Sequence, residues 1–204
     1  VYLRARYYDP ATGQFLTRDP IEAATREPYG YVGGNPLNAT DPSGLIWKKF
    51  AVWIDDVANN FGIDAVMLAA VIEREGGDRA SCGVICRRLE SHGLAGKTIG
   101  VGQMRVDLAN CLVETHWGVK ESLGDTRKRL ANNDEDAIAL AGAYLHDLQE
   151  EYGLTSRQAA IAYAFGESSI GELQRTNWSG PQASRLGRGY DRRYRSISAT
   201  GLVG

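Results

Sequence analysis

The composition of this chain changes abruptly between residues 45 and 46, and that change constrains the fold more than any other feature. Residues 38–54 read NATDPSGLIWKKFAVWI, in which turn-forming Asn, Asp, Pro, Ser and Gly give way to Trp, Phe, Val and Ile. Five of the six prolines precede the change, at positions 10, 20, 28, 36 and 42. The sequence therefore predicts two regions, residues 1–45 and residues 46–204.

The first region alternates turn signals with short stretches rich in Tyr, Val, Phe and Leu. Segments such as YYDPATGQFL, TRDPIE and GGNPLN combine Pro, which fixes φ, with Gly, Asp and Asn, which suit turns. The stretches between them favour brief strands. A segment this short cannot close a core alone, so we expect a β- and turn-rich remnant of a larger β structure. Because the chain begins with Val rather than Met, we also expect it to be part of a longer protein.

The second region has the periodicity of helices, so we predict a mainly α domain. Apolar residues recur at spacings of three and four, and the expected helices occupy residues 47–62, 64–76, 103–117, 134–153 and 155–166. Asp64 and Asp134 are the expected N-caps of two of them, and Thr155 with Gln158 forms a capping box. Residues 77–102 are expected to form a loop.

Charge and hydropathy exclude several classes of protein. The net charge is −2, whereas a dedicated nucleic-acid-binding protein is usually strongly basic. The chain lacks an apolar run near the ~20 residues that a membrane-spanning helix requires. Its first residues, VYLRARYYDP, carry charges where a signal peptide has an apolar segment. We therefore expect neither nucleic-acid binding nor membrane insertion.

The motifs of the first region occur in a recognisable order. The sequence YLRARYYDPATGQFLTRDPI, followed by YGYVGGNPLNATDPSGL, resembles the end of the Rhs-repeat core, a β-cocoon that encloses polymorphic toxins. The resemblance covers residues 1–45. In that family an Asp-Pro-x-Gly-Leu motif ends the cocoon, which cleaves itself there and releases a variable C-terminal toxin. The matching residues here run from Asp41 to Leu45, so the resemblance implies a scissile bond between Leu45 and Ile46.

Two aspartates are the candidates for that self-cleavage. By motif the family's aspartate pair corresponds to Asp19 and Asp41, with Arg18 beside Asp19. Two carboxyl groups held close together do not both ionise easily, so one can act as acid and the other as base. The alternative is structural, because Asp before Pro usually forms a turn.

In the second region a carboxyl group ends an apolar helix. In LAAVIEREGG, Glu73 and Glu75 point about 200° apart on a helix, and Glu75 lies nearer the side of Leu68, Val71 and Ile72. The negative pole of the helix dipole and partial desolvation both raise the pKa of a carboxyl group there. A general acid that works near neutral pH needs such a raised pKa. The alternative is an ordinary solvated glutamate at a helix end.

Three motifs in order resemble the lysozyme-like superfamily of soluble lytic transglycosylases and goose-type lysozymes. They are Ile72–Gly76, Gly100–Met104 and Ala162–Gly166, which match the family's Ile-x-x-Glu-Ser, Gly-x-Gly-Leu-Met-Gln and Ala-Tyr-Asn-x-Gly. The resemblance covers about residues 63–170 and places the catalytic acid at Glu75. The chain departs from the pattern by Gly76 for Ser and by Ala164 for Asn. In the glycine-rich motif Gln103 stands in the place of Leu and Arg105 in that of Gln.

The lysozyme-like resemblance implies a substrate and further site residues. The substrate is the β-1,4 glycan of peptidoglycan, cleaved between N-acetylmuramic acid and N-acetylglucosamine without a metal or other cofactor. Gly102, Gln103 and Met104 are the expected substrate-binding loop. Tyr163 is expected to orient Glu75, to line the sugar groove or to pack in the core.

The type of reaction depends on a second carboxylate. A lytic transglycosylase needs none, because the same Glu can activate the muramyl 6-hydroxyl. A hydrolase needs a carboxylate that positions water or stabilises the cation. Asp107 is the best candidate, with Glu90 and Asp78 behind it, although Asp107 also suits an exposed helix position.

The cysteines, the histidines and a basic tail allow other interpretations, namely a metal site, a disulfide or the binding of an anionic partner. The spacing of Cys82, Cys86, His92, Cys111 and His116 matches no common zinc module. A Cys82–Cys86 or Cys86–Cys111 disulfide is favoured if the protein acts in the oxidising periplasm. The tail RLGRGYDRRYR suits a solvated, partly disordered terminus or a grip on an anionic partner. His146 is expected to be exposed.

The two resemblances together imply a secreted antibacterial effector. It would be delivered, through a type VI apparatus or a related system, to the periplasm of a target cell. Its implied partners are the rest of the Rhs cocoon, peptidoglycan and a cognate periplasmic immunity protein. The rival hypotheses are a nuclease toxin on the same scaffold and a domain without enzymatic activity.

Overall fold

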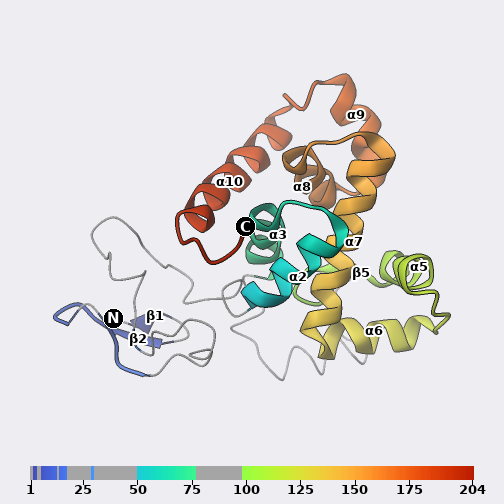
Figure 1. Ribbon diagram of the computed structural model, residues 1–204. Coiled ribbons are helices and arrows are strands. Elements are labelled where there is room, and N and C mark those ends of the chain that lie inside the picture. Colours follow the sequence, from blue (N-terminus) through green and yellow to red (C-terminus); the bar gives the residue numbers. More distant parts are fainter. Residues whose placement is uncertain (1, 4–5, 13, 18–28, 30–49, 77–97) are drawn as a thin grey trace.

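The computed structural model describes residues 2–3, 6–12, 14–17, 29, 50–76 and 98–204 (Figure 1). This part of the chain is 71% helix and 5% strand, which confirms the expected mainly α class. The residues expected to take part in self-cleavage, Arg18, Asp19, Asp41, Leu45 and Ile46, lie outside the described residues. The same holds for the domain boundary itself, which stays a prediction.

The first region contains three short antiparallel strands in the order β1-β2-β3: Tyr2–Leu3, Arg6–Asp9 and Gln14–Phe15. The turn between β2 and β3 contains Pro10, and Asp9 stabilises it. The Asp9 carboxylate accepts hydrogen bonds from the Ala11 amide at 3.0 Å and the Thr12 hydroxyl at 3.1 Å. This is the Asx chemistry that the Asp-Pro signal predicts.

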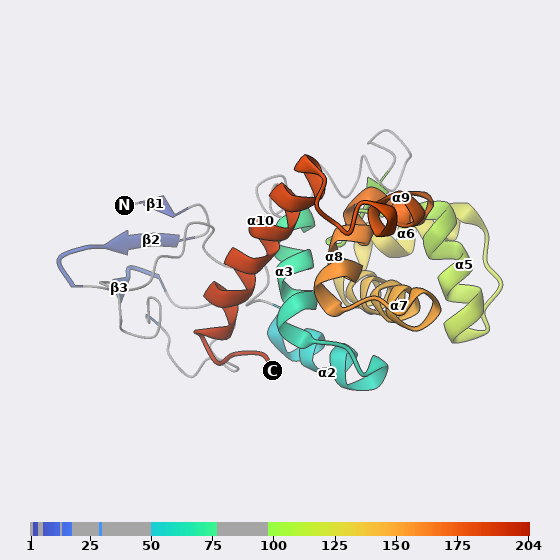
Figure 2. The same ribbon diagram turned by 90° about the horizontal axis from the view of Figure 1, so that it is seen from above.

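The second region is an assembly of helices around one core (Figures 1 and 2). The helices and the short strand pair follow one another as α2 (Ala51–Phe61), α3 (Ala65–Gly76), β4 (Thr98–Ile99), β5 (Met104–Arg105), α5 (Val106–Trp117), α6 (Leu123–Asn132), α7 (Asp134–Tyr152), α8 (Ser156–Phe165), the 3₁₀ turn η4 (Glu167–Ser169), α9 (Ile170–Arg175) and α10 (Pro181–Ser198).

The long helix α7 runs through the centre of this assembly and packs against α2, α5, α6 and α8. Its buried stripe includes Ile138, Ala141, Leu145 and Leu148, as the periodicity predicts. On the side that faces α2 stands Gly142, where a β-carbon would lie only 2.3 Å from Val57 Cγ1. The absence of a side chain at this position therefore lets α2 and α7 approach closely.

The N-cap residues of the helices are those that the sequence predicts, except at the start of α7. Asp64 caps α3, accepting from the Met67 amide at 3.0 Å, and Thr155 with Gln158 forms the predicted capping box of α8. The cap of α7 is Asn133 rather than Asp134, because Asn133 Oδ1 accepts from the Asp136 amide at 3.1 Å. Asp134 is instead the first helical residue, where a negative charge favours the positive end of the helix.

Three other expectations were wrong. Residues 98–99 and 104–105 pair as strands in a segment expected to be a loop and the start of a helix, so α5 begins at Val106 rather than residue 103. Helices α6, α9 and α10 were not predicted. The basic tail is part of α10, whose inner face buries Ala183, Gly187, Tyr190 and Ile197, because these residues recur at helical spacing between the arginines.

Within the described ranges, no helix is both long and apolar enough to cross a lipid bilayer.

Candidate active site

Glu75 lies in the last turn of α3, at the end of a buried helix. Val71 and Ile72, one turn earlier, are fully buried, and the Glu75 side chain is 20% exposed. Burial raises the pKa of Glu75, while the neighbouring charges of Arg74 and Arg193 oppose the shift. The direction of the shift agrees with the expectation for a general acid.

Glu75 pairs with Arg74 on the same helix, and Arg74 in turn contacts α10. The Arg74 guanidinium forms an ion pair with the Glu75 carboxylate, and its Nη1 also donates to the Tyr190 hydroxyl at 3.2 Å. The guanidinium lies 5.4 Å from the centre of the Tyr190 ring, which is itself completely buried. Tyr190 was not predicted as a site residue, because the surrounding arginines hid the apolar spacing of the tail.

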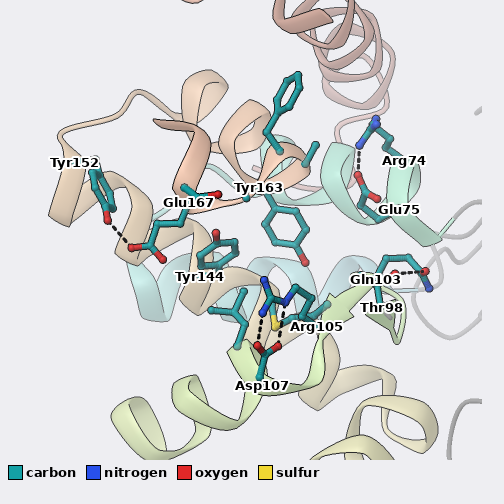
Figure 3. Close-up of a pocket in the computed structure, with 16 residues that line it drawn as sticks. Arg74, Glu75, Thr98, Gln103, Arg105, Asp107, Tyr144, Tyr152, Tyr163 and Glu167 are labelled. Carbon is teal, nitrogen blue, oxygen red and sulfur yellow. Dashed lines mark hydrogen bonds and ion pairs between the residues drawn. The ribbon is translucent and has the colours of Figure 1, made fainter. Parts of the chain in front are cut away.

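Glu75 opens onto a cleft of about 1000 Å³ (Figure 3). Its walls come from the end of α3, the β4-β5 hairpin, the start of α5, the middle and end of α7 and the end of α8. The lining residues are Arg74, Glu75, Thr98, Gln103, Met104, Arg105, Asp107, Leu108, Tyr144, Tyr152, Tyr163, Ala164, Phe165, Gly166, Glu167 and Ser168. The three sequence motifs therefore meet at one cleft, although they lie far apart in the chain.

The glycine-rich motif forms the tip of the β4-β5 hairpin. Gly100 has a φ of +81°, and a β-carbon there would lie 2.9 Å from the Leu130 carbonyl oxygen, so this turn requires glycine. Gln103 has a φ of +46° and uses its side chain within the hairpin. Its Oε1 accepts from Thr98 Oγ1 at 3.1 Å and its Nε2 donates to the Gly100 carbonyl at 3.0 Å. The Gln103 amide therefore stabilises the loop, and the side chain of Met104 is buried beneath it.

Tyr163 joins α8 to this hairpin. Its hydroxyl donates to the Gly102 carbonyl at 2.7 Å, and its ring packs against Tyr144 with 5.3 Å between ring centres. A β-carbon on Gly102 would lie 2.8 Å from the same hydroxyl, which explains the need for glycine. Of the roles expected for Tyr163, lining the groove and packing against the core both agree with this geometry. Its hydroxyl is bonded to Gly102 rather than to Glu75.

Asp107, the expected second carboxylate, lies at the rim of the same cleft in the first turn of α5. Its side chain is 58% exposed and forms an ion pair with Arg105, whose Nε donates to Oδ1 at 3.0 Å. These hydrogen bonds from Arg105 lower the pKa of Asp107. The charge of Asp107 is therefore largely balanced by its neighbour.

A carboxylate that the sequence did not reveal, Glu167, lines the cleft on the side away from Glu75 (Figure 3). Gly166 ends α8 with a φ of +87°, which turns the chain so that Glu167 faces the end of α7. There the Tyr152 hydroxyl donates to Glu167 Oε1. Burial and the charge of Glu167 together raise the pKa of nearby Tyr144 to about 12.

The candidate metal ligands do not come together in the described residues. Cys82, Cys86 and His92, like Asp78 and Glu90, lie outside those residues, and Cys111 is exposed on α5. Elsewhere in the described ranges, groups of three or more His, Cys, Asp or Glu that would suit a metal are absent.

Two histidines of the helical region, His116 and His146, are packing residues. His116 Nε2 lies 3.0 Å from the Asp147 carboxylate, and the ring of Phe61 packs against both His116 and His146, at 5.4 and 5.7 Å between centres. The expectation that His146 is merely exposed was wrong, because α2 covers this side of α7.

Comparisons with family models, curated proteins and solved structures returned no match to this chain. The assignment of a function therefore depends on the motifs and on the geometry of the cleft.

Proposed function

We propose that residues 46–204 form a peptidoglycan glycosidase that cleaves the β-1,4 bond between N-acetylmuramic acid and N-acetylglucosamine. The observation that carries this proposal is the position of Glu75. It ends a buried helix, opens onto a cleft of about 1000 Å³ and has a pKa raised by burial. A protonated carboxyl group in a cleft is what general-acid cleavage of a glycosidic bond requires.

In this reaction Glu75 protonates the glycosidic oxygen as the bond from C1 to that oxygen breaks. Positive charge then develops on the ring oxygen and C1 of the muramic acid. Arg74, paired with Glu75 in the free protein, stabilises the carboxylate that proton transfer leaves behind. The ion pair therefore favours the ionised form of Glu75, which is present after its proton has moved to the glycosidic oxygen.

The lining of the cleft suits a sugar chain. Tyr144, Tyr152 and Tyr163 line the cleft, and aromatic side chains with a polar end suit the apolar faces and polar edges of sugar rings. A volume of about 1000 Å³ is at the upper end of ordinary ligand sites, which favours an extended ligand over a small molecule.

The test is digestion of purified sacculi by the full chain, followed by mass spectrometry of the soluble fragments. We expect cleavage between muramic acid and glucosamine, reduced at least about 10²-fold in Glu75→Gln. The matched control is Glu172→Gln, an exposed carboxylate on α9 that does not line the cleft. Intact sacculi after treatment with correctly folded protein would falsify the proposal.

A second candidate, a nuclease, is favoured by one observation on α10. Arg185, Arg188, Arg192 and Arg195 are exposed and recur on one face of this helix, as a polyanion-binding surface requires. Cleavage of DNA or RNA that depends on a divalent metal and survives Glu75→Gln would support the nuclease.

The biological setting is proposed from the Rhs resemblance alone. The first region would release the helical region by cleavage after Leu45, and a cognate immunity protein would protect the producing cell in its periplasm. A periplasmic location of toxicity is testable, since expression of the helical region should lyse cells only when an export signal is added.

A further inference from the structure

We propose that Glu167, together with Tyr144 and Tyr152, forms a subsite at the end of the cleft away from Glu75, and that this subsite binds a primary ammonium group of the substrate. The inference rests on the proposed glycosidase function and deepens it, because it names a part of the substrate that the cleft recognises. Glu167 then acts in binding rather than in cleavage of the bond.

The first argument is position. Glu167 and Tyr152 lie on the opposite side of the cleft from Glu75 in Figure 3, with the rings of Tyr144 and Tyr163 between them. The Glu167 side chain is exposed, so a ligand in the cleft can reach it. Because of this separation, a group bound at Glu167 belongs to a part of the substrate remote from the bond that Glu75 protonates.

The second argument is charge. Five charged residues line the cleft, namely Arg74, Glu75, Arg105, Asp107 and Glu167. Arg74 pairs with Glu75, and Arg105 pairs with Asp107. Within the part of the chain that the structure describes, Glu167 forms no ion pair with a Lys, Arg or His. The end of the cleft at Glu167 therefore carries a negative charge that the protein leaves unbalanced, and it attracts a cation.

The third argument is the pair of tyrosines beside this carboxylate. The Tyr152 hydroxyl donates to Glu167 Oε1, and this hydrogen bond raises the pKa of Tyr152 to about 12. Burial and the charge of Glu167 raise the pKa of Tyr144 to about 12 as well. Both phenol groups are therefore neutral near pH 7. A carboxylate beside aromatic rings binds an ammonium group through its charge and through cation–π attraction.

The chemistry of peptidoglycan limits what this cation can be. Its N-acetylated sugars are neutral, and the carboxyl groups of its stem peptides are repelled by Glu167. The cationic groups that remain are primary amines, which are protonated at neutral pH when they belong to an amino-acid side chain. One source is the diamino acid of a stem peptide, and the other is a glucosamine that has lost its acetyl group. A carboxylate that contacts only sugar hydroxyls would not distinguish a free amine from an acetylated one.

The experiment compares two forms of one substrate. Soluble, uncross-linked glycan strands prepared from sacculi are digested by the full chain either as isolated or after chemical acetylation of their amines. We expect acetylation to lower kcat/KM of the wild type at least about tenfold, the effect of one hydrogen bond between charged groups. The loss should lie mainly in KM, because the subsite is remote from the reacting bond. Glu172→Gln, which removes an exposed carboxylate on α9, should keep the preference for the free amine.

The decisive variant is Glu167→Gln, which removes the charge but keeps an oxygen that can accept from Tyr152. It should cleave both forms at the rate at which the wild type cleaves the acetylated strands. A preference for the free amine that survives this substitution would overturn the inference, and so would equal cleavage of both forms by the wild type. A slower but equally selective Glu167→Gln would count against it too, because a structural role predicts that result.

Calorimetry measures the same preference without catalysis, which separates this inference from the proposed function. Glu75→Gln retains the subsite and should bind strands with free amines about tenfold more tightly than acetylated strands. The variant that also carries Glu167→Gln should bind both alike. Equal binding of both forms by Glu75→Gln would refute the subsite. Selective binding without cleavage by the wild type would support the subsite and contradict the glycosidase instead.

Removal of the stem peptides with an amidase identifies the source of the amine. If the preference disappears with the stems, the subsite binds the diamino acid of the stem peptide. If it persists on the bare strands, the subsite binds glucosamine residues that lack an acetyl group. Both results support an ammonium subsite at Glu167, provided that Glu167→Gln removes the preference in each case.

Discussion

At the scale of single residues, the candidate acid is held between two opposing effects. Burial at the end of α3 disfavours the charge of Glu75, whereas Arg74 and the Tyr190 hydroxyl favour it. Burial is the larger effect, so the pKa of Glu75 is raised above that of an exposed glutamate. A cost in stability follows, because a charge in this position is tolerated rather than favoured.

We therefore predict that Glu75→Gln stabilises the fold near pH 7 while it lowers activity at least about 10²-fold. With a raised pKa in the folded state, folding takes up protons between the unfolded and folded pKa values, so the stability contributed by Glu75 falls as pH rises through that interval. The gain from Gln should be about 0.5–2 kcal/mol at pH 7 and should vanish at pH values below the ordinary glutamate pKa. Thermal unfolding at several pH values measures it. A gain independent of pH would contradict the explanation.

A second residue-scale prediction concerns the contact between the hairpin and α8. Gly102→Ala should destabilise the protein by about 1–3 kcal/mol, because its β-carbon would lie 2.8 Å from the Tyr163 hydroxyl. Tyr163→Phe alone should cost about 1 kcal/mol through the lost hydrogen bond to Gly102. Chemical denaturation of both variants and of the double variant tests the contact. The two costs should not add, since Phe removes the atom with which Ala collides.

The surroundings that the sequence predicts correctly are those with a local signal. Glu75 ends an apolar helix and lines the cleft, and Gly100 lies in a glycine-rich turn with a positive φ. Gln103 lines the cleft, and its side-chain amide bonds to Thr98 and Gly100 within the hairpin, contacts that the sequence does not predict. Glu167 has no signal of its own: it becomes a site residue only because Gly166 redirects the chain toward Tyr152 on another helix.

At the scale of elements, the helices that escaped prediction are the polar ones. Helix α6 has the sequence LGDTRKRLAN and buries only Thr126, Leu130 and Ala131, too few apolar residues for a clear period. Helix α10 is rich in Arg, yet it buries Tyr190 against α3 and binds α8 through Arg157 and Asp191, 2.7 Å apart. Tertiary contacts rather than local propensity therefore decide both helices.

The close approach of α2 and α7 provides a prediction at this scale. Gly142→Ala should destabilise the protein by about 1–3 kcal/mol, because the new methyl group would overlap Val57 Cγ1. Gly171→Ala is the matched control on α9, where a β-carbon meets nothing within 4 Å. It should be neutral or stabilising by up to about 1 kcal/mol, as expected for Ala in a helix. Equal effects in denaturant titrations would refute the packing argument.

At the scale of the whole molecule, the helical region closes on itself. The buried core of the described residues extends from Phe50 before α2 to Val203 near the C-terminus. The last residue returns to the start of the region, where the Gly204 amide donates to Asp55 Oδ1 at 3.1 Å. The last described residues therefore contact α2, the first helix described in this region.

This closure predicts what separation after Leu45 would do. Residues 46–204, produced alone, should fold with the helix content of the full chain and a Tm within a few degrees, since 1 kcal/mol shifts the Tm of a domain of this size by about 2–4 °C. Circular dichroism and calorimetry of both forms test it. The matched control is a chain that starts after α2, which lacks Ile54 and Val57 and should not fold cooperatively. A large loss of stability in the 46–204 form would mean that the first region is part of the same folding unit. The hypothesis that cleavage after Leu45 releases an active domain would then fail with it, because a domain that needs the first region to fold could not act once it was released.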